Sequence, residues 1–258
     1  MIIVEQFSKA YQEMLAVREL SFTVESGQIL GLVGRNGAGK TTTLRTLAGI
    51  IPGSSGRLSV DGFDLVGDPL AAKKLTAYVP DDPQLFNDLS VEQHLKFTAS
   101  VYEIEQPAAH IVELLKLFEL ESKRHTTATE LSRGMRQKLA ICCAYLSQPK
   151  ALLLDEPMTG LDPQAIRVLK QSILQIAKSG SAVIISSHLL AMVEDICSHA
   201  LILDSGQTKF FGTLNELQTT FGSQTGDLNE SSLENAYFAA VMGTPTQPFP
   251  STTVENIF

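Results

Sequence analysis

The chain has 258 residues and a formal net charge of -8, and its 44% hydrophobic and 19% charged residues exclude an intrinsically disordered protein. The acidic balance and the lack of a basic stripe argue against nucleic acid as the main partner. No run approaches the roughly 20 apolar residues that span a bilayer, so we expect any membrane role to depend on a partner protein.

The first part of the chain predicts short strands and one helix. Met1–Val4 and Ser21–Val24 have strand character, and Ile29–Val33 is a continuous apolar run with the length of a buried strand. A glycine-rich loop separates this run from a helix predicted at Thr41–Ile50. A further strand, Arg57–Val60, ends at an Asp-Gly hairpin signal.

The middle of the chain is helical by its periodicity. Apolar residues recur at helical spacing over residues 90–121, and Ser90 with Gln93 forms a capping-box pattern that starts the first helix. Leu131–Leu146 predicts another helix. We therefore expect a helical insert over about residues 86–149 within an α/β domain.

Parallel-sheet character returns after this insert. Ala151–Leu154 and Ala182–Ile185 predict buried strands, and the helix Gln164–Lys178 separates them. Leu201–Leu203 predicts an outer strand. Beyond residue 222 the composition shifts to Ser, Thr, Gly, Pro and Asn, which predicts a tail with one helix around Leu233–Met242.

The loop at Gly34–Thr41 reads G-R-N-G-A-G-K-T and matches the phosphate-binding pattern GxxxxGK[ST] in the expected strand–loop–helix context. Backbone N–H groups and the helix N-terminus surround phosphates, Lys40 neutralises their charge, and the Thr41 hydroxyl suits magnesium. A chance glycine-rich turn is the weaker alternative. The predicted ATP-binding residues are Gly34, Asn36, Gly37, Ala38, Gly39, Lys40, Thr41 and Thr42.

Two carboxylates end the strand at Ala151–Leu154. Asp155 is expected at the carboxyl edge of a parallel sheet, where ligands bind, and can hold magnesium directly or through water. Glu156 is placed to orient and polarise an attacking water. An ordinary acidic strand end is the alternative, which the phosphate loop upstream makes weaker.

The segment Leu131–Gln137 reads L-S-R-G-M-R-Q and resembles the LSGGQ signature of ABC ATPases. Read alone, it predicts only N-capping of a helix, but its place before the strand-end carboxylates favours the signature. In this family the signature of one subunit closes on the γ-phosphate held by another. The resemblance implies that ATP is contacted in trans by Ser132, Gly134 and Met135.

Three smaller matches agree with this resemblance, and one residue departs from it. Asp162, in Gly-Leu-Asp-Pro, resembles the loop that crosses the dimer interface, and also predicts a helix cap. His188 resembles the switch histidine that contacts the γ-phosphate. Tyr11 stands where the family stacks an aromatic ring on adenine, although a surface tyrosine is the alternative. Asp81 replaces the family's glutamine, so direct metal contact, contact through water, partner contact and a simple turn stay open.

The resemblance covers about residues 1–222 and implies an α/β fold of the P-loop NTPase (RecA-like) class, with a mostly parallel core, an antiparallel β subdomain and a helical insert. Core and β subdomain are expected over about 1–85 and 150–222, with the insert at 86–149 and a tail at 223–258. The implied catalytic residues are Lys40, Glu156 and His188, and the implied cofactors are ATP and Mg²⁺.

The implied partners are a second ATPase subunit, expected as a homodimer, and an integral membrane permease, which would hold the chain at the cytoplasmic face of the membrane. Details of Pro80-Asp81-Asp82 and of the signature resemble the exporter class. A soluble, non-transport ABC ATPase is one alternative, which the single nucleotide domain and the charge disfavour. A regulatory module that binds ATP without turnover is another, which Glu156 and His188 disfavour.

Overall fold

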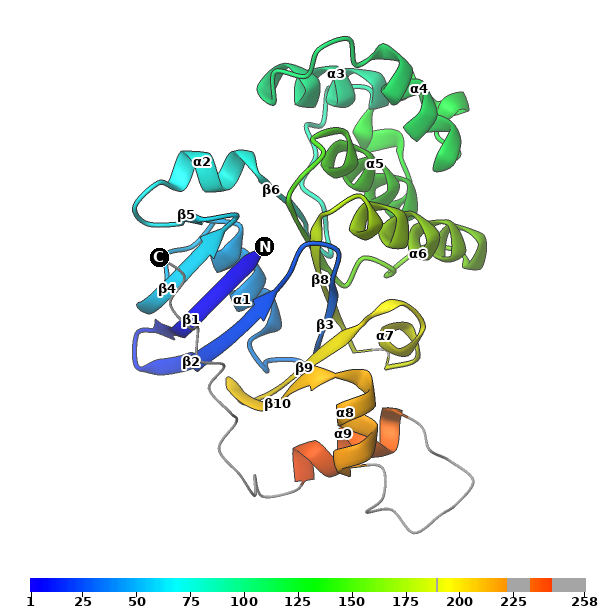
Figure 1. Ribbon diagram of the computed structural model, residues 1–258. Coiled ribbons are helices and arrows are strands. Elements are labelled where there is room, and N and C mark those ends of the chain that lie inside the picture. The colour runs from blue at the N-terminus through cyan, green and yellow to red at the C-terminus, as the bar shows by residue number, and fades with distance from the viewer. Residues whose placement is uncertain (189, 222–232, 243–258) are drawn as a thin grey trace.

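The computed structural model describes residues 1–188, 190–221 and 233–242 and contains two sheets. In the larger sheet the strand order is β10-β9-β3-β8-β7-β6, and all neighbours are parallel except β9 and β10 (Figure 1). Its strands are β3 (Ile29–Val33), β6 (Thr76–Val79), β7 (Ala151–Asp155), β8 (Ala182–Ser187), β9 (His199–Asp204) and β10 (Gln207–Thr213).

The smaller sheet is antiparallel and has the order β2-β1-β4-β5. Its strands are β1 (Ile2–Tyr11), β2 (Met14–Val24), β4 (Ser55–Val60) and β5 (Phe63–Asp64). The mostly parallel core, the antiparallel subdomain and the helices inserted between β6 and β7 confirm the fold class expected from the sequence.

The apolar strands β3, β7 and β8 are buried at every position, as expected when helices or a second sheet cover both faces. Successive residues point to opposite faces, so Leu152 and Leu154 belong to one core and Leu153 to the other. The first core includes α5 (Arg133–Leu146), α6 (Pro163–Lys178) and α7 (Leu190–Ile196). The second includes α1 (Lys40–Leu47), which lies between the two sheets (Figure 1).

The insert between β6 and β7 consists of α3 (Val91–Val101), α4 (Ala108–Leu117), two short 3₁₀ turns (Glu121–Lys123 and Ala128–Glu130) and α5. The capping box predicted for α3 is formed: the Gln93 N–H donates to Ser90 Oγ, and the Ser90 N–H donates to Gln93 Oε1. A short helix, α2 (Pro69–Lys74), precedes β6.

The prediction that Leu201–Leu203 forms an outer strand was wrong. β9, which contains Leu201–Leu203, lies inside the sheet between β3 and β10, and β10 forms the edge. β10 was missed because its residues are mostly half-buried and show no clean alternation. The predicted strands Met1–Val4 and Ser21–Val24 are also longer, because β1 and β2 continue into a hairpin that joins Tyr11 to Met14.

The last two described helices are α8 (Leu214–Phe221) and α9 (Leu233–Met242). Helix α9 occupies the range predicted for the tail helix. Buried residues of α9, Leu233, Ala236 and Ala240, belong to the core that contains α7. The rest of the predicted tail, 223–232 and 243–258, lies outside the described residues. Among the helices of the described ranges, none combines the length and hydropathy needed to cross a bilayer.

Candidate functional site

The glycine-rich loop between β3 and α1 is shaped to receive an anion. Helix α1 begins at Lys40, and its cap residue Gly39, with φ of 105°, offers no side-chain acceptor to the first N–H groups. A Cβ on Gly39 would lie 2.8 Å from the Ala16 carbonyl oxygen, whereas the space beside Gly37 is open. The uncapped helix N-terminus therefore fits a phosphate group.

Lys40 brings a cation into this loop. The side chain is buried, its Nζ donates to the Gly34 carbonyl oxygen at 2.7 Å, and the same Nζ lies 3.7 Å from Glu156 Oε1. Gly34 has no room for a side chain, since a Cβ would meet the Leu203 carbonyl oxygen at 2.4 Å. The end of β9 thus fixes one side of the loop while the lysine faces the end of β7.

Asp155, the last residue of β7, is almost fully buried, with both oxygens bonded by neighbouring strands. Ser186 Oγ, on β8, donates to Oδ1 at 2.5 Å, and the Tyr78 hydroxyl, on β6, donates to Oδ2 at 3.2 Å. Burial and the negative charge of Asp155 raise the pKa of Tyr78 to about 12. Tyr78 consequently keeps its proton at neutral pH and holds the carboxylate in one orientation.

Sequence reasoning missed Tyr78, Ser186 and a third residue, Arg45. A hydrogen bond to Tyr78, together with the charges of Asp155 and Asp81, raises the pKa of the Arg45 guanidinium. The parallel register places Ser186 beside Asp155 and Tyr78 beside Leu153. The available signal was a polar residue near the end of each adjacent apolar strand. The sequence did not show the register that brings these residues to Asp155.

Glu156 adopts a left-handed backbone conformation, with φ of 46°, that is uncommon for a residue with a side chain. Its N–H donates to Ser186 Oγ at 2.9 Å, which helps to hold this turn. Its Oε2 lies 2.8 Å from His188 Nδ1, and because a carboxylate only accepts, Nδ1 carries the hydrogen. The structure therefore brings together Lys40, Glu156 and His188.

This neighbourhood can supply the oxygen ligands that magnesium prefers. Within the described residues no three Asp, Glu, His or Cys side chains form a metal cluster. Thr41 lies in the first turn of α1 and Asp155 ends β7, so a hydroxyl and a carboxylate are the available protein groups. Such a site fits Mg²⁺ when the phosphates complete the coordination.

Tyr11 lies on the hairpin of β1 and β2, the same hairpin whose Ala16 approaches Gly39 of the phosphate loop. The residue is 42% exposed, and Lys9 Nζ lies 5.0 Å from the centroid of its ring. Asp81 is exposed and follows β6, next to the strand that carries Asp155. The roles of Tyr11 and Asp81 stay predictions.

The signature residues lie at the start of α5. Ser132 caps this helix, and its Oγ accepts the Met135 N–H at 3.3 Å, as the simple capping interpretation predicts. A Cβ on Gly134 would lie only 2.6 Å from the Gly160 carbonyl oxygen. The glycine of the signature is therefore needed for close approach to the loop before α6.

Asp162 caps α6 in the same region. Its Oδ1 accepts the Ala165 N–H at 2.9 Å, and this bond lowers the pKa of the carboxyl group. The side chain is 61% exposed, so capping leaves part of the carboxylate available to another molecule. The structure thus groups Asp162 with the signature residues rather than with the helix that begins at Lys40.

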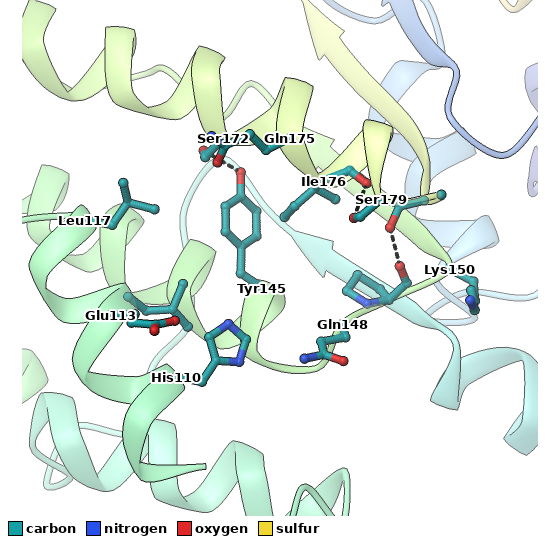
Figure 2. A pocket seen from close by; sticks show the side chains of 14 residues that line it. His110, Glu113, Leu117, Tyr145, Gln148, Lys150, Ser172, Gln175, Ile176 and Ser179 are labelled. Carbon is teal, nitrogen blue, oxygen red and sulfur yellow. Dashed lines mark hydrogen bonds between the residues drawn. The ribbon is translucent and has the colours of Figure 1, made fainter.

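Two cavities differ in their relation to this site. One of about 460 Å³ borders the pair formed by Glu156 and His188. Another of about 740 Å³ lies between α4, α5 and α6 (Figure 2). Its buried Tyr145 hydroxyl bonds to Ser172, and its lining includes none of Lys40, Glu156 and His188, so the larger cavity is separate from the site described above.

Comparisons with known proteins agree with this geometry. Residues 17–159 match the ABC transporter family. The ABC-type transporter ATP-binding protein EcsA of Bacillus subtilis (strain 168) is 35% identical over 91% of this chain and 96% of EcsA. The lipopolysaccharide export system ATP-binding protein LptB of Escherichia coli (strain K12) is 34% identical over 83% of this chain and 90% of LptB.

A solved structure described as the ATP-binding subunit of an ABC transporter has a TM-score of 0.87 and 32% identity to this chain. The match covers 93% of this chain and 99% of that structure. The similarity extends over the phosphate loop, the insert and the strand-end carboxylates. This chain therefore belongs to the ABC transporter family, as an ATP-binding and ATP-hydrolysing subunit.

Proposed function

We propose that two copies of this chain bind head to tail, hold two ATP molecules between them, and drive export through a separate membrane permease. The main support is the position of the two helix N-termini. Leu44 and Leu47 of α1 pack on one face of the larger sheet, whereas Leu139 and Ile141 of α5 pack on the other. A phosphate at Lys40 therefore needs the signature of a second chain.

Within each site the residues divide the work. Lys40 and the N–H groups that start α1 neutralise the phosphates, and Tyr11 stacks on adenine. Glu156 orients a water molecule and accepts its proton, while His188 holds the carboxylate in position and reaches toward the γ-phosphate. Ser132, Gly134 and Met135 bind the same phosphate from the partner chain.

Mg²⁺ would neutralise charge on the phosphate oxygens, with Thr41 and Asp155 as the protein groups that hold it, Asp155 directly or through water. Asp81 completes this shell through water or contacts the permease. Asp162 lies at the interface between the two copies. The domain limits belong to the same proposal, with residues 1–222 as the ATPase domain and 86–149 as its insert.

The permease is proposed because no described helix can span a membrane, although the chain belongs to a transporter family. The assembly would then lie on the cytoplasmic face of the cell membrane. Export is proposed because the name of the relative LptB assigns it to an export system. The permease determines which cargo is transported. Identifying the permease by co-purification would test the direction of transport, because an importer-type permease would contradict export.

A substitution at Ser132 separates capping from phosphate binding in trans. Asp and Asn both replace Ser well as helix caps, but only Asp places a negative charge against a phosphate. We expect Ser132→Asp to abolish ATP turnover and Ser132→Asn to preserve most of it. Equal rates of phosphate release from both variants would show that the signature does not contact the phosphate.

Mixing two inactive variants tests the head-to-tail arrangement. Lys40→Ala retains an intact signature and Ser132→Asp retains an intact phosphate loop, so a mixed dimer assembles one complete site. We expect phosphate release from the mixture to exceed the sum of the separate rates. No recovery on mixing would contradict sites that are shared between chains.

Tyr78→Phe tests whether Asp155 holds the metal. The change removes the hydroxyl that donates to Asp155 Oδ2 and retains the ring. We expect the Mg²⁺ concentration for half-maximal turnover to rise by about fivefold, which corresponds to about 1 kcal/mol, the net contribution of a typical hydrogen bond. Tyr102→Phe, at the end of α3, is the matched control and should leave this concentration unchanged.

A further inference from the structure

Gln137, in the second turn of α5, has an unusual environment. The residue is 1% exposed, and its Nε2 donates a long hydrogen bond of 3.4 Å to the Pro80 carbonyl oxygen. Its Oε1 is buried and has no hydrogen-bond partner within the described residues. The amide is therefore only half satisfied, at a place where water does not reach it.

Stability does not explain this choice of residue. A buried amide oxygen without a donor destabilises the folded state, because the group has lost its hydrogen bonds to water. Methionine has a similar size and would fill the same volume without that penalty. The polar group at Gln137 therefore points to a state in which the amide has a fuller set of partners.

The location of Gln137 identifies what that state involves. On a helix, residues three apart share a face, so Gln137 lies one turn beyond Gly134 of the signature. Pro80, its bonding partner, lies between Tyr78, which bonds to Asp155, and Asp81. The amide thus joins the signature helix to the loop that leaves the magnesium side of the site.

The same helix turn is also tied to a second loop, through the next residue, Lys138. Lys138 Nζ lies 3.9 Å from Asp162 Oδ2 and 3.9 Å from Glu119 Oε2. The close approach of Gly134 to Gly160 adds a backbone contact to the same loop. The start of α5 is consequently held against the loop before α6, and Gln137 is its link to the loop at Pro80.

We propose that Gln137 is a positioning residue that couples the loop at Pro80–Gln84 to the placement of the signature. In the closed, ATP-bound dimer, Oε1 and Nε2 of Gln137 both form hydrogen bonds to that loop. These bonds fix Ser132 and Gly134 against the partner's phosphate. The inference rests on the proposed function, since it assumes that the signature acts in trans. Gln137 itself touches neither nucleotide nor metal.

The test compares Gln137→Met with a control on the same helix. We expect Gln137→Met to retain or raise the thermal unfolding midpoint, because the unpartnered oxygen is removed. We expect kcat for ATP to fall by about tenfold, a usual size for coupling between sites, while nucleotide binding to the single chain changes less than about twofold. Gln137→Leu is the second apolar variant, and we expect it to behave like Gln137→Met.

Tyr145→Phe provides the control, because it removes one buried hydrogen bond of α5, to Ser172, at the other end of the helix (Figure 2). It should lower the unfolding midpoint and leave kcat unchanged, the reverse of the pattern at Gln137. If the variants at Gln137 lose kcat only as they lose stability, or retain the parental kcat, the inference is overturned.

A second measurement separates this inference from the proposed function. Size-exclusion chromatography with ATP is run on Glu156→Gln alone and on Glu156→Gln with Gln137→Met. Support requires that the single variant dimerises and that the double variant needs about tenfold more ATP to do so. Equal ATP requirements overturn the coupling role alone. Absence of any ATP-dependent dimer for Glu156→Gln overturns the proposed dimer, and the coupling role with it.

Discussion

Glu156→Gln is expected to lower the rate of ATP hydrolysis by about 10²- to 10⁴-fold, the usual contribution of a positioned general base. The amide has nearly the same size as the carboxylate but does not accept a proton from water. ATP binding should persist, because the phosphate loop is unchanged. Phosphate release, together with size-exclusion chromatography in the presence of ATP, should show a slow enzyme that accumulates as an ATP-bound dimer.

A charge control makes this result specific. Glu194 is an exposed carboxylate on α7, the helix that follows His188, so Glu194→Gln removes the same charge at a neighbouring element. We expect its turnover to match the parent. Turnover of Glu156→Gln that also matches the parent would exclude Glu156 as the base and transfer the role to another group near His188.

The sequence predicted the central strands well because their signals are local. β3, β7 and β8 are continuous apolar runs, and burial on both faces is the only environment that suits them. The phosphate loop and the cap of α3 were recognisable for the same reason, since each depends on residues a few positions apart. Lys40, Glu156 and His188 followed from motifs at the ends of such runs.

What the sequence did not predict depends on which strand lies beside which. Tyr78 and Ser186 reach Asp155 only because β6 and β8 flank β7 in a particular register. β9 was placed at the edge because the half-buried residues of β10 have no strand periodicity. The amide of Gln137 is equally non-local, because 57 residues separate it from Pro80.

Lys40→Met is expected to weaken ATP binding by about 10- to 100-fold, the effect of removing a charged hydrogen-bond donor from a buried site. Methionine preserves most of the volume of the lysine stem, so the loop between Gly34 and Gly39 should retain its shape. Titration with a fluorescent nucleotide measures the loss. Lys40→Arg tests geometry, because a planar guanidinium does not fit where a compact ammonium donates to Gly34.

The contact between Lys40 and Glu156 makes the two main predictions interdependent. In this structure the lysine Nζ lies 3.7 Å from Glu156 Oε1, so a bound phosphate must share the cation with that carboxylate. Glu156→Gln should therefore tighten ATP binding, and this gain should vanish when Lys40 is also methionine. A double-mutant cycle on ATP affinity measures this coupling. Purely additive effects would show that the lysine does not exchange the carboxylate for the phosphate when ATP binds.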